Sequence, residues 1–476
     1  MPLIAGVDSS TQSTKVEIRD QETGAVVASA SAPHTPVTAP LSEQDPASWW
    51  TAFEQAWALA GSPEVAAISI GGQQHGMVAL DADGLAVHPA KLWNDTESAD
   101  DADRLTGIFS PADWAAAVGS VPVAAFTITK LAWLARTHPD VWSKVRHVML
   151  PHDYITNRLT GQLTTGSTTD RGDASGTGYW SPAEGNYRTD LLDLVDNTLE
   201  WESMLPSVLG PMDHAGLSTS ASIAIGAVVA PGTGDNMAGA LGVGLRPGDA
   251  VISIGTSCTV YAVSNTPTSD PSGAVAGFAD ATGRFLPLVC TSNAAKVVDA
   301  VARLLGTDHD EFDRLAVAAL PEGPTLLPYF DGERTPNRPN ARGVIGGIRT
   351  EVTREQFARA AVDGVACGLL DALDALRALT VLDGRVMLTG GGSRSQAMQQ
   401  VIASLIDSPV VLSSAHEAVA TGAAVQACAV LEQVDHSVVQ DRWGLGAGAQ
   451  VDPTIPPDTT TRVRYRALRD ASPSDG

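Results

Sequence analysis

The chain has 476 residues, too many for one ordinary hydrophobic core, so we expect two large domains. Its formal net charge of −24 argues against nucleic acid and against an anionic membrane surface as partners. Four scattered cysteines form no C-x-x-C pair, which disfavours a zinc site or a disulfide framework.

The N-terminus does not have the pattern of a signal peptide, because an acid already occurs at Asp8. No apolar run is long enough to span a bilayer. We therefore expect a cytoplasmic protein with no membrane partner.

The first strand–turn–strand unit carries a turn of small polar residues. Residues 3–7 predict a buried strand, residues 8–13 a polar loop, and residues 15–18 a returning strand. Backbone N–H groups and hydroxyls on such a turn can bind phosphate oxygens. A carboxylate beside a phosphate is repulsive unless a divalent cation lies between them, so Asp8 is a candidate for organising Mg²⁺ through water. A turn-capping role for Asp8 fits this motif equally well.

A cluster of polar side chains of the kind that binds a polyol follows. Residues 65–70 predict a buried strand, and the cluster begins just after it. Its members are Gln74, His75, Trp93, Asn94 and Asp95. Together they supply donors, acceptors and an aromatic wall at fixed positions. Taken alone, His75 and Trp93 would be core residues, but the polar neighbours of His75 favour a ligand contact.

The middle of the first half alternates between helix and loop signals. Helical spacing predicts helices over residues 126–136 and 139–147, and residues 150–153 are expected to break the pattern. Residues 171–178 are rich in glycine and predict an ordered loop.

Asp235 lies on a glycine turn that ends an apolar run over residues 223–230. The small residues at 237–244 would let another group approach the backbone closely. An Asp in this position can cap a helix or point its carboxylate at a ligand, and the start of a helix would keep it ionised. The preceding polar cluster favours the second use, with Asp235 as a base for a sugar hydroxyl.

The second half repeats the plan of the first. Residues 250–254 predict a strand, Gly255, Thr256 and Ser257 a small loop, and residues 259–263 a returning strand. Two copies indicate a duplicated fold with a phosphate-sized loop in each, although strand–turn–strand units are common enough to match by chance.

The last signals are a long helix and a glycine turn. Residues 354–379 have helical spacing, and a strand over 386–389 runs into Gly391, Gly392 and Ser393 before a helix over 396–405. Such a turn suits a nucleotide lying against bare backbone, and a purely structural turn is an equal alternative.

These motifs resemble those of the FGGY family of carbohydrate kinases, and the matches run almost from end to end. They are residues 6–8, 42–46, 49–50, 72–76, 92–95, 126–131, 151–154, 234–236, 255–257, 332–336 and 390–393. The resemblance implies an α/β fold of two actin-like (ribonuclease H-like) domains with a central cleft for ATP and sugar. It implies a sugar-binding N-terminal domain over residues 1–246, with the catalytic Asp, and a nucleotide-binding C-terminal domain over residues 247–476.

The resemblance also implies a reaction and roles for residues. The γ-phosphoryl group of ATP would pass to the terminal hydroxyl of a ketopentose, with D-xylulose favoured. Asp235 would accept the proton, Asp8 would position Mg-ATP, and both would contact Mg²⁺ through water. With the polar cluster included, the expected sugar contacts are Gln74, His75, Trp93, Asn94, Asp95, Asp235 and Asn236. The expected nucleotide contacts are Ser10, Thr11, Gln12, Lys15, Gly255, Thr256, Ser257, Gly391, Gly392 and Ser393. A homodimer is a candidate assembly.

Two departures from the family pattern leave alternatives open. Ser10 stands where the family commonly has glycine before its Thr, which weakens the assignment of Ser10 and Gln12. Gln74 stands where many members acting on xylulose carry Met, and its amide could add a hydrogen bond to the sugar. A related kinase for ribulose, a deoxysugar or a sugar alcohol therefore stays open.

A protein of another class, a non-catalytic actin-like ATPase switch or filament subunit, would not need the polar cluster. A sugar-sensing repressor is disfavoured, because no basic helix-turn-helix precedes the first domain.

Overall fold

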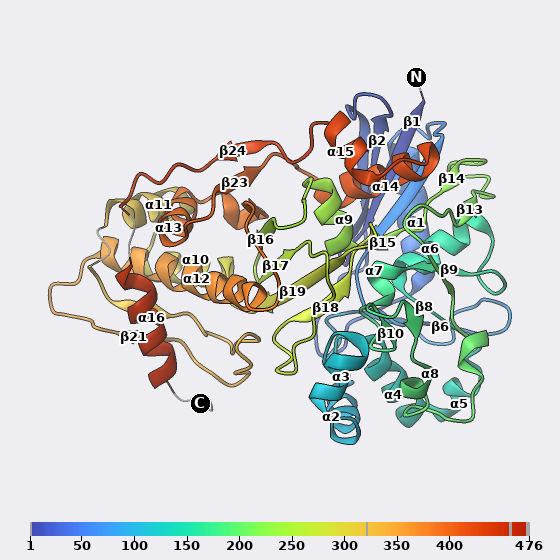
Figure 1. The fold of residues 1–476 in the computed structure, drawn as a ribbon, viewed down its shortest axis with the longest axis horizontal. Helices are drawn as coiled ribbons and strands as arrows, with labels where there is room; N and C mark the ends of the chain where they lie inside the picture. The colour runs from blue at the N-terminus through green and yellow to red at the C-terminus, as the bar shows by residue number, and fades with distance from the viewer. Residues whose placement is uncertain (1, 320–321, 457–458, 473–476) are drawn as a thin grey trace. The chain divides into compact units, whose positions relative to one another are not determined.

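The computed structural model describes residues 2–319, 322–456 and 459–472, which divide into two compact units. Unit 1 comprises Met1–Gly244, Asn265–Leu286 and Ala415–Gly446. Unit 2 comprises Leu245–Ser264, Pro287–Ser414 and Ala447–Gly476. Each unit is therefore built from chain segments that are far apart in the sequence (Figure 1).

The sheet of unit 1 follows the order β13-β14-β5-β1-β2-β3, and β15 also pairs with β5. Its strands are β1 (Leu3–Ser9), β2 (Ser13–Asp20), β3 (Val26–Pro33), β5 (Ala67–Gly72), β13 (Gly216–Leu217), β14 (Val228–Val229) and β15 (Thr233–Gly234). β1 runs antiparallel to β2 and parallel to β5, and β5 is parallel to β14 and β15.

Helices cover both faces of this sheet. Successive side chains of a strand point to opposite faces, so neighbouring residues of β1 pack against different helices. Ala5 and Val7 of β1 join a core cluster with α1 (Pro46–Leu59) and α6 (Pro151–Thr160). Ile4 joins a second cluster with α14 (Ala418–Glu432), the red helix beside β1 in Figure 1. The other helices of unit 1 include α2 (Ala99–Ile108), α3 (Pro111–Val118), α4 (Thr127–Thr137), α7 (Arg171–Ala174), α9 (Asp235–Gly242) and α15 (His436–Arg442).

The sheet of unit 2 repeats this strand pattern in the order β19-β17-β16-β22-β23-β24. Its strands are β16 (Ala250–Ile254), β17 (Cys258–Ala262), β19 (Phe285–Thr291), β22 (Val386–Thr389), β23 (Val410–Ser413) and β24 (Gly448–Gln450). β16 is antiparallel to β17 and parallel to β22, as β1 is to β2 and β5. The helices around it include α10 (Ala295–Leu305), α11 (His309–Ala318), α12 (Arg354–Arg377), α13 (Gln396–Leu405) and α16 (Thr460–Ala471). The predicted duplication is confirmed.

Two local predictions in the middle of the chain are wrong. The helix predicted over 139–147 is the single turn α5 (Pro139–Trp142), and His147 already begins the strand β8 (His147–Met149). Residues 150–153 do not break the structure but start α6. Proline suits the first helical position, and the Asp153 side chain accepts a hydrogen bond from the backbone N–H of Leu150 at 2.9 Å.

Candidate functional site

Three parallel strands of unit 1 end at the same edge of the sheet. Asp8 of β1 and Thr233 of β15 both lie opposite Gly71 of β5. The residues at or just after these strand ends therefore converge, as at the carboxyl edge of other open α/β sheets. The structure thus brings together Asp8, the pair Gln74-His75 and the pair Asp235-Asn236, which are more than 200 residues apart at the extremes.

Asp235 is the first residue of α9, and Gly234 occupies the capping position before it. Its Oδ1 accepts a hydrogen bond from Asn236 Nδ2 at 2.9 Å, and the same Nδ2 donates to Gln74 Oε1 at 2.6 Å. Burial, together with the charges of Asp8 and Asp173, raises the pKa of Asp235 to about 7. The helix start is therefore not enough to keep this carboxylate fully ionised at neutral pH.

Asp8 is a second buried carboxylate at this edge. It is 6% exposed, and its Oδ1 has no hydrogen-bond partner among the described residues. Burial raises the pKa of Asp8 to about 7, although the charge of Lys15, opposite it on β2, lowers it. The Lys15 ammonium itself pairs with Glu417 at 2.8 Å. Asp8 and Asp235 are thus carboxylates whose ionised forms would gain from an added cation.

His75 has a left-handed backbone conformation, with a φ of 62°. Its backbone N–H donates to Asp173 Oδ1 at 3.3 Å. Its ring lies between Phe126 and Phe278, at centroid distances of 5.2 and 5.1 Å. A Cβ on Gly176 would lie 2.0 Å from Nδ1, so only glycine leaves room for the ring. Burial lowers the pKa of His75 to about 4, and the imidazole is neutral at physiological pH.

A buried cluster of His152 and three carboxylates, which the sequence analysis did not identify, holds the backbone of His75 through Asp173. His152 Nδ1 lies 2.9 Å from Asp173 Oδ2, and its Nε2 lies 3.1 Å from Asp153 Oδ1 and 3.6 Å from Asp170 Oδ1. Burial lowers the pKa of His152, but the three carboxylates outweigh this and raise it to about 9. The sequence feature that could have indicated this cluster is the pair of acids Asp170 and Asp173, at the start of the loop predicted over residues 171–178.

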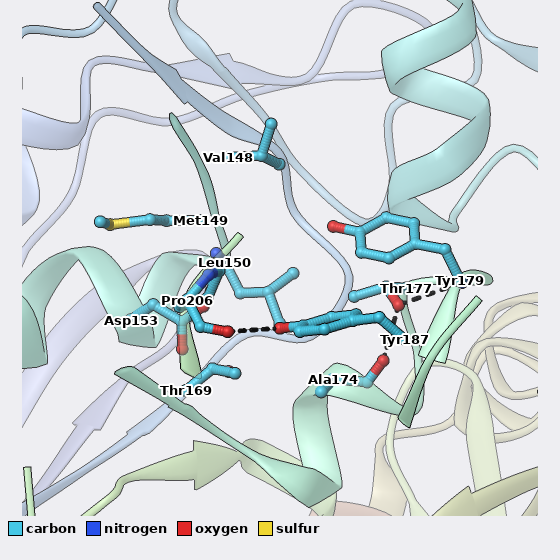
Figure 2. Close-up of a pocket in the computed structure, with 10 residues that line it drawn as sticks. All are labelled: Val148, Met149, Leu150, Asp153, Thr169, Ala174, Thr177, Tyr179, Tyr187 and Pro206. Carbon is cyan, nitrogen blue, oxygen red and sulfur yellow. Dashed lines mark hydrogen bonds between the residues drawn. The ribbon is translucent and has the colours of Figure 1, made fainter. Parts of the chain in front are cut away.

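The small cavity beside this group is too small for a sugar. It has a volume of about 10 Å³, about that of one water molecule. Figure 2 shows Asp153 and the rings of Tyr179 and Tyr187 in its wall, with Tyr187 Oη donating to the Pro206 carbonyl at 2.8 Å.

The other predicted sugar contacts divide into two groups. Trp93 Nε1 donates to Thr11 Oγ1 at 3.0 Å, so the indole contacts the first polar loop, and Asn94 Oδ1 is buried without a hydrogen-bond partner among the described residues. Asp95 is fully buried, and its Oδ2 accepts from Lys91 Nζ at 3.0 Å and from the Ser42 backbone N–H at 2.9 Å. Because Oδ2 of Asp95 is already bound by Lys91 and Ser42, this carboxylate stabilises the fold and is a poor candidate for a sugar contact.

Lys91 also explains a cluster of acids that resembles a metal site. Oxygens of Glu43, Asp95 and Glu97 lie within 4.8 Å of one another. Lys91 Nζ lies 2.9, 3.0 and 2.7 Å from them, so an ammonium group already binds all three carboxylates.

The remaining nucleotide candidates of unit 1 surround a tight turn. Ser10 Oγ donates to the Ser13 carbonyl at 3.1 Å, and Gln12 is exposed. Thr11 Oγ1 donates to Gln73 Oε1 at 3.3 Å, which links this turn to the residue before Gln74.

In unit 2 the two predicted nucleotide loops lie at the ends of the neighbouring parallel strands β16 and β22. Gly255, Thr256 and Ser257 are exposed. A Cβ on Gly392 would lie 2.4 Å from Cγ2 of Ile254, the last residue of β16. The turn that holds Gly391, Gly392 and Ser393 therefore packs directly against the strand that leads into Gly255.

The small residues after Asp235 have a structural role. A Cβ on Gly242 would lie 1.8 Å from the Ala418 carbonyl oxygen, and one on Gly422 would lie 1.7 Å from that of Ala238. The group that approaches this backbone is thus α14 of the same unit.

The fold and the site define a two-domain kinase of small sugars, and comparisons with known proteins agree. Residues 3–242 match the N-terminal domain of the FGGY family of carbohydrate kinases, and residues 250–431 match its C-terminal domain. The chain therefore belongs to the FGGY family of carbohydrate kinases, whose members use ATP.

Several similar proteins are named xylulose kinases. The chain is 46% identical to a xylulose kinase of Streptomyces coelicolor, over 99% of this chain and 97% of the relative. It is 34% identical to a xylulose kinase of Haemophilus influenzae, over 89% of each. The crystal structure of xylulose kinase from Bifidobacterium adolescentis superposes with a TM-score of 0.88 at 40% identity, over 98% of this chain and 99% of that one. Among the described residues, none of the helices is both long and apolar enough for a membrane span.

Proposed function

We propose that this chain transfers the γ-phosphoryl group of ATP to the terminal hydroxyl of D-xylulose. The observation that carries the proposal is the convergence of Asp235, Asn236, Gln74 and His75 at one sheet edge in a carbohydrate kinase fold. The names of the similar proteins support xylulose as the sugar.

The mechanism assigns proton transfer to Asp235. Phosphoryl transfer depends mainly on positioning and charge neutralisation, so the base has to orient the hydroxyl and accept its proton. The Asp235 carboxylate is suited to accept a proton, because its pKa of about 7 lies near the operating pH. The neutral His75 imidazole can exchange hydrogen bonds with sugar hydroxyls without adding charge.

The residues present fit a magnesium ion. Asp8 has a buried oxygen without a partner among the described residues, and the charge of Asp8 raises the pKa of Asp235. Carboxylate oxygens are the ligands that Mg²⁺ prefers, often through water. Asp8 and Asp235 would hold the ion, which when bound neutralises phosphate charge.

The nucleotide is assigned to the small loops. Gly255, Thr256 and Ser257 are exposed, and the backbone N–H groups and hydroxyls of Thr256 and Ser257 are of the kind that bind phosphate, while the turn at Gly391 and Gly392 offers bare backbone. In unit 1, Thr11 and Lys15 would add contacts to phosphate. In this proposal residues 1–246 supply most of the sugar contacts and residues 247–476 most of the nucleotide contacts, although residues 265–286 and 415–446 fold with unit 1.

The test has two parts. Asp235→Asn should lower sugar-dependent turnover by about 10²–10⁴-fold and leave the affinity for ATP without Mg²⁺ unchanged by calorimetry. Asp193→Asn, which alters an exposed carboxylate of the same unit, is the matched control and should retain the wild-type rate. A coupled assay over D-xylulose, D-ribulose, deoxyketoses and sugar alcohols should give the highest kcat/KM for D-xylulose. A near-normal kcat for Asp235→Asn would refute the base, and a preference for another acceptor would refute the sugar.

A further inference from the structure

Gln74 is held against the segment that carries the base. The residue is 4% exposed, and its side chain lies against Gly234, the residue before Asp235. A Cβ on Gly234 would lie 2.6 Å from Gln74 Cγ and 2.8 Å from its Nε2, so this packing requires glycine.

Both ends of the Gln74 amide bind that same segment. Oε1 accepts from Asn236 Nδ2 at 2.6 Å, and Nε2 contacts the sulfur of Met237 at 3.2 Å. With Oε1 bonded to Asn236, Nε2 against Met237 and only 4% of the residue exposed, the Gln74 amide offers little free surface to a sugar, which disfavours Gln74 as a direct sugar contact.

The bond to Gln74 fixes the orientation of Asn236. Asn236 Nδ2 has two hydrogens, and one is donated to Gln74 Oε1 while the other is donated to Asp235 Oδ1. A flipped Asn236 amide would place its oxygen against both of these acceptors. Gln74 therefore ensures that Asn236 presents a donor to Asp235.

We propose that Gln74 is a positioning residue that orients the Asp235 carboxylate through Asn236, and that it does not select the sugar by direct contact. The inference rests on the proposed function, since it assumes that Asp235 is the base. A methionine in this position could not accept the Asn236 hydrogen bond in this way, so Gln74 places an added constraint on the base.

A double-mutant cycle tests the inference. Gln74→Met has nearly the same length and should lower kcat for D-xylulose about 3- to 10-fold, the effect of one lost hydrogen bond, with the Kd for xylulose by calorimetry changed less than about 2-fold. In an Asn236→Ala background, the same substitution should have almost no further effect on kcat, because the link to Asp235 is already broken.

The outcomes separate this inference from the proposed function. Additive effects on kcat, or a weaker xylulose Kd with kcat unchanged, would overturn the positioning role and make Gln74 a sugar contact. A wild-type protein that turns over ATP without any sugar dependence would instead overturn the proposed function. Melting temperatures of all variants check folding, and Gln74→Leu replaces Gln74→Met if that variant does not fold.

Discussion

The contact between α9 and α14 leads to a strong prediction for Gly422. In Gly422→Ala the new Cβ would lie 1.7 Å from the Ala238 carbonyl oxygen and 2.8 Å from the Gly242 nitrogen. Carbon and oxygen normally stay about 3.3 Å or more apart, so the two helix backbones must separate by roughly 1.5 Å. No side-chain rotation can relieve this clash, because the contacted atoms belong to the backbone.

The expected loss in the free energy of unfolding is the difference between the cost of overpacking and the gain in helix propensity. A clash between backbone atoms should cost about 3 kcal/mol, the upper end of the range for overpacking, and alanine regains about 1 kcal/mol of helix propensity. Unit 1 has about 300 residues and an entropy of unfolding of about 0.6 kcal/mol/K, so a net loss of about 2 kcal/mol lowers its melting temperature by roughly 3 °C. Since α9 begins with Asp235, a shift of about 1 Å should also reduce kcat by about 10²-fold.

The assays are thermal unfolding by circular dichroism and sugar-dependent turnover. Gly107→Ala is the matched control, because Gly107 is also helical, belongs to the same unit and has no atom within 4 Å of its added Cβ. It should keep the wild-type melting temperature or raise it slightly. A Gly422→Ala protein as stable as the wild type would show that the helices do not pack as closely as described.

Four further predictions follow from the site. The value of kcat/KM for the sugar should fall as the pH drops towards the pKa of Asp235, which is about 7 without a metal and lower with Mg²⁺ bound, because protonated Asp235 cannot accept a proton; a flat profile down to the ordinary Asp pKa of 3.8 would contradict its role as base. His75→Ala should reduce kcat/KM for the sugar by more than about 10-fold with little change for ATP, whereas an unchanged sugar KM would assign His75 to the core alone. Chelation of Mg²⁺ by EDTA should abolish turnover and added Mg²⁺ should restore it, and turnover in EDTA would argue against a metal at Asp8 and Asp235. Lys91→Met should lower the free energy of unfolding in urea by about 3–5 kcal/mol, because it leaves the buried Asp95 without its cation; a variant within 1 kcal/mol of wild type would refute this.

The parts of the fold that depend on local sequence could be predicted. The strands at 250–254 and 386–389 and the helix at 396–405 occur as expected, because alternation and glycine turns are local signals. The convergence of Gln74 and Asp235 was implied by the family resemblance, in which both residues contact the sugar. The start of α6 was missed because a proline can either break a helix or begin one.

The rest of the site depends on contacts that are distant in the sequence. Asp173 binds His75 across 98 positions, and no periodicity in the chain connects them. The small residues after Asp235 indicated that something lies close to their backbone, but the partner, α14, begins at Ala418. Asp95 was a reasonable sugar contact by type, and only the position of Lys91 shows that its oxygen is already bound.

The return of residues 415–446 to unit 1 has a consequence for biosynthesis. Strand β1 leaves the ribosome early, yet the helix that covers its Ile4 face is among the last segments to be translated. At a translation rate of 5–20 residues per second, the roughly 200 residues between Gly244 and Gly446 delay completion of unit 1 by about 10–40 s. During that time Ile4 and Ala67 lack their native cover, so the nascent chain depends on chaperones or on transient contacts to shield this face until α14 arrives.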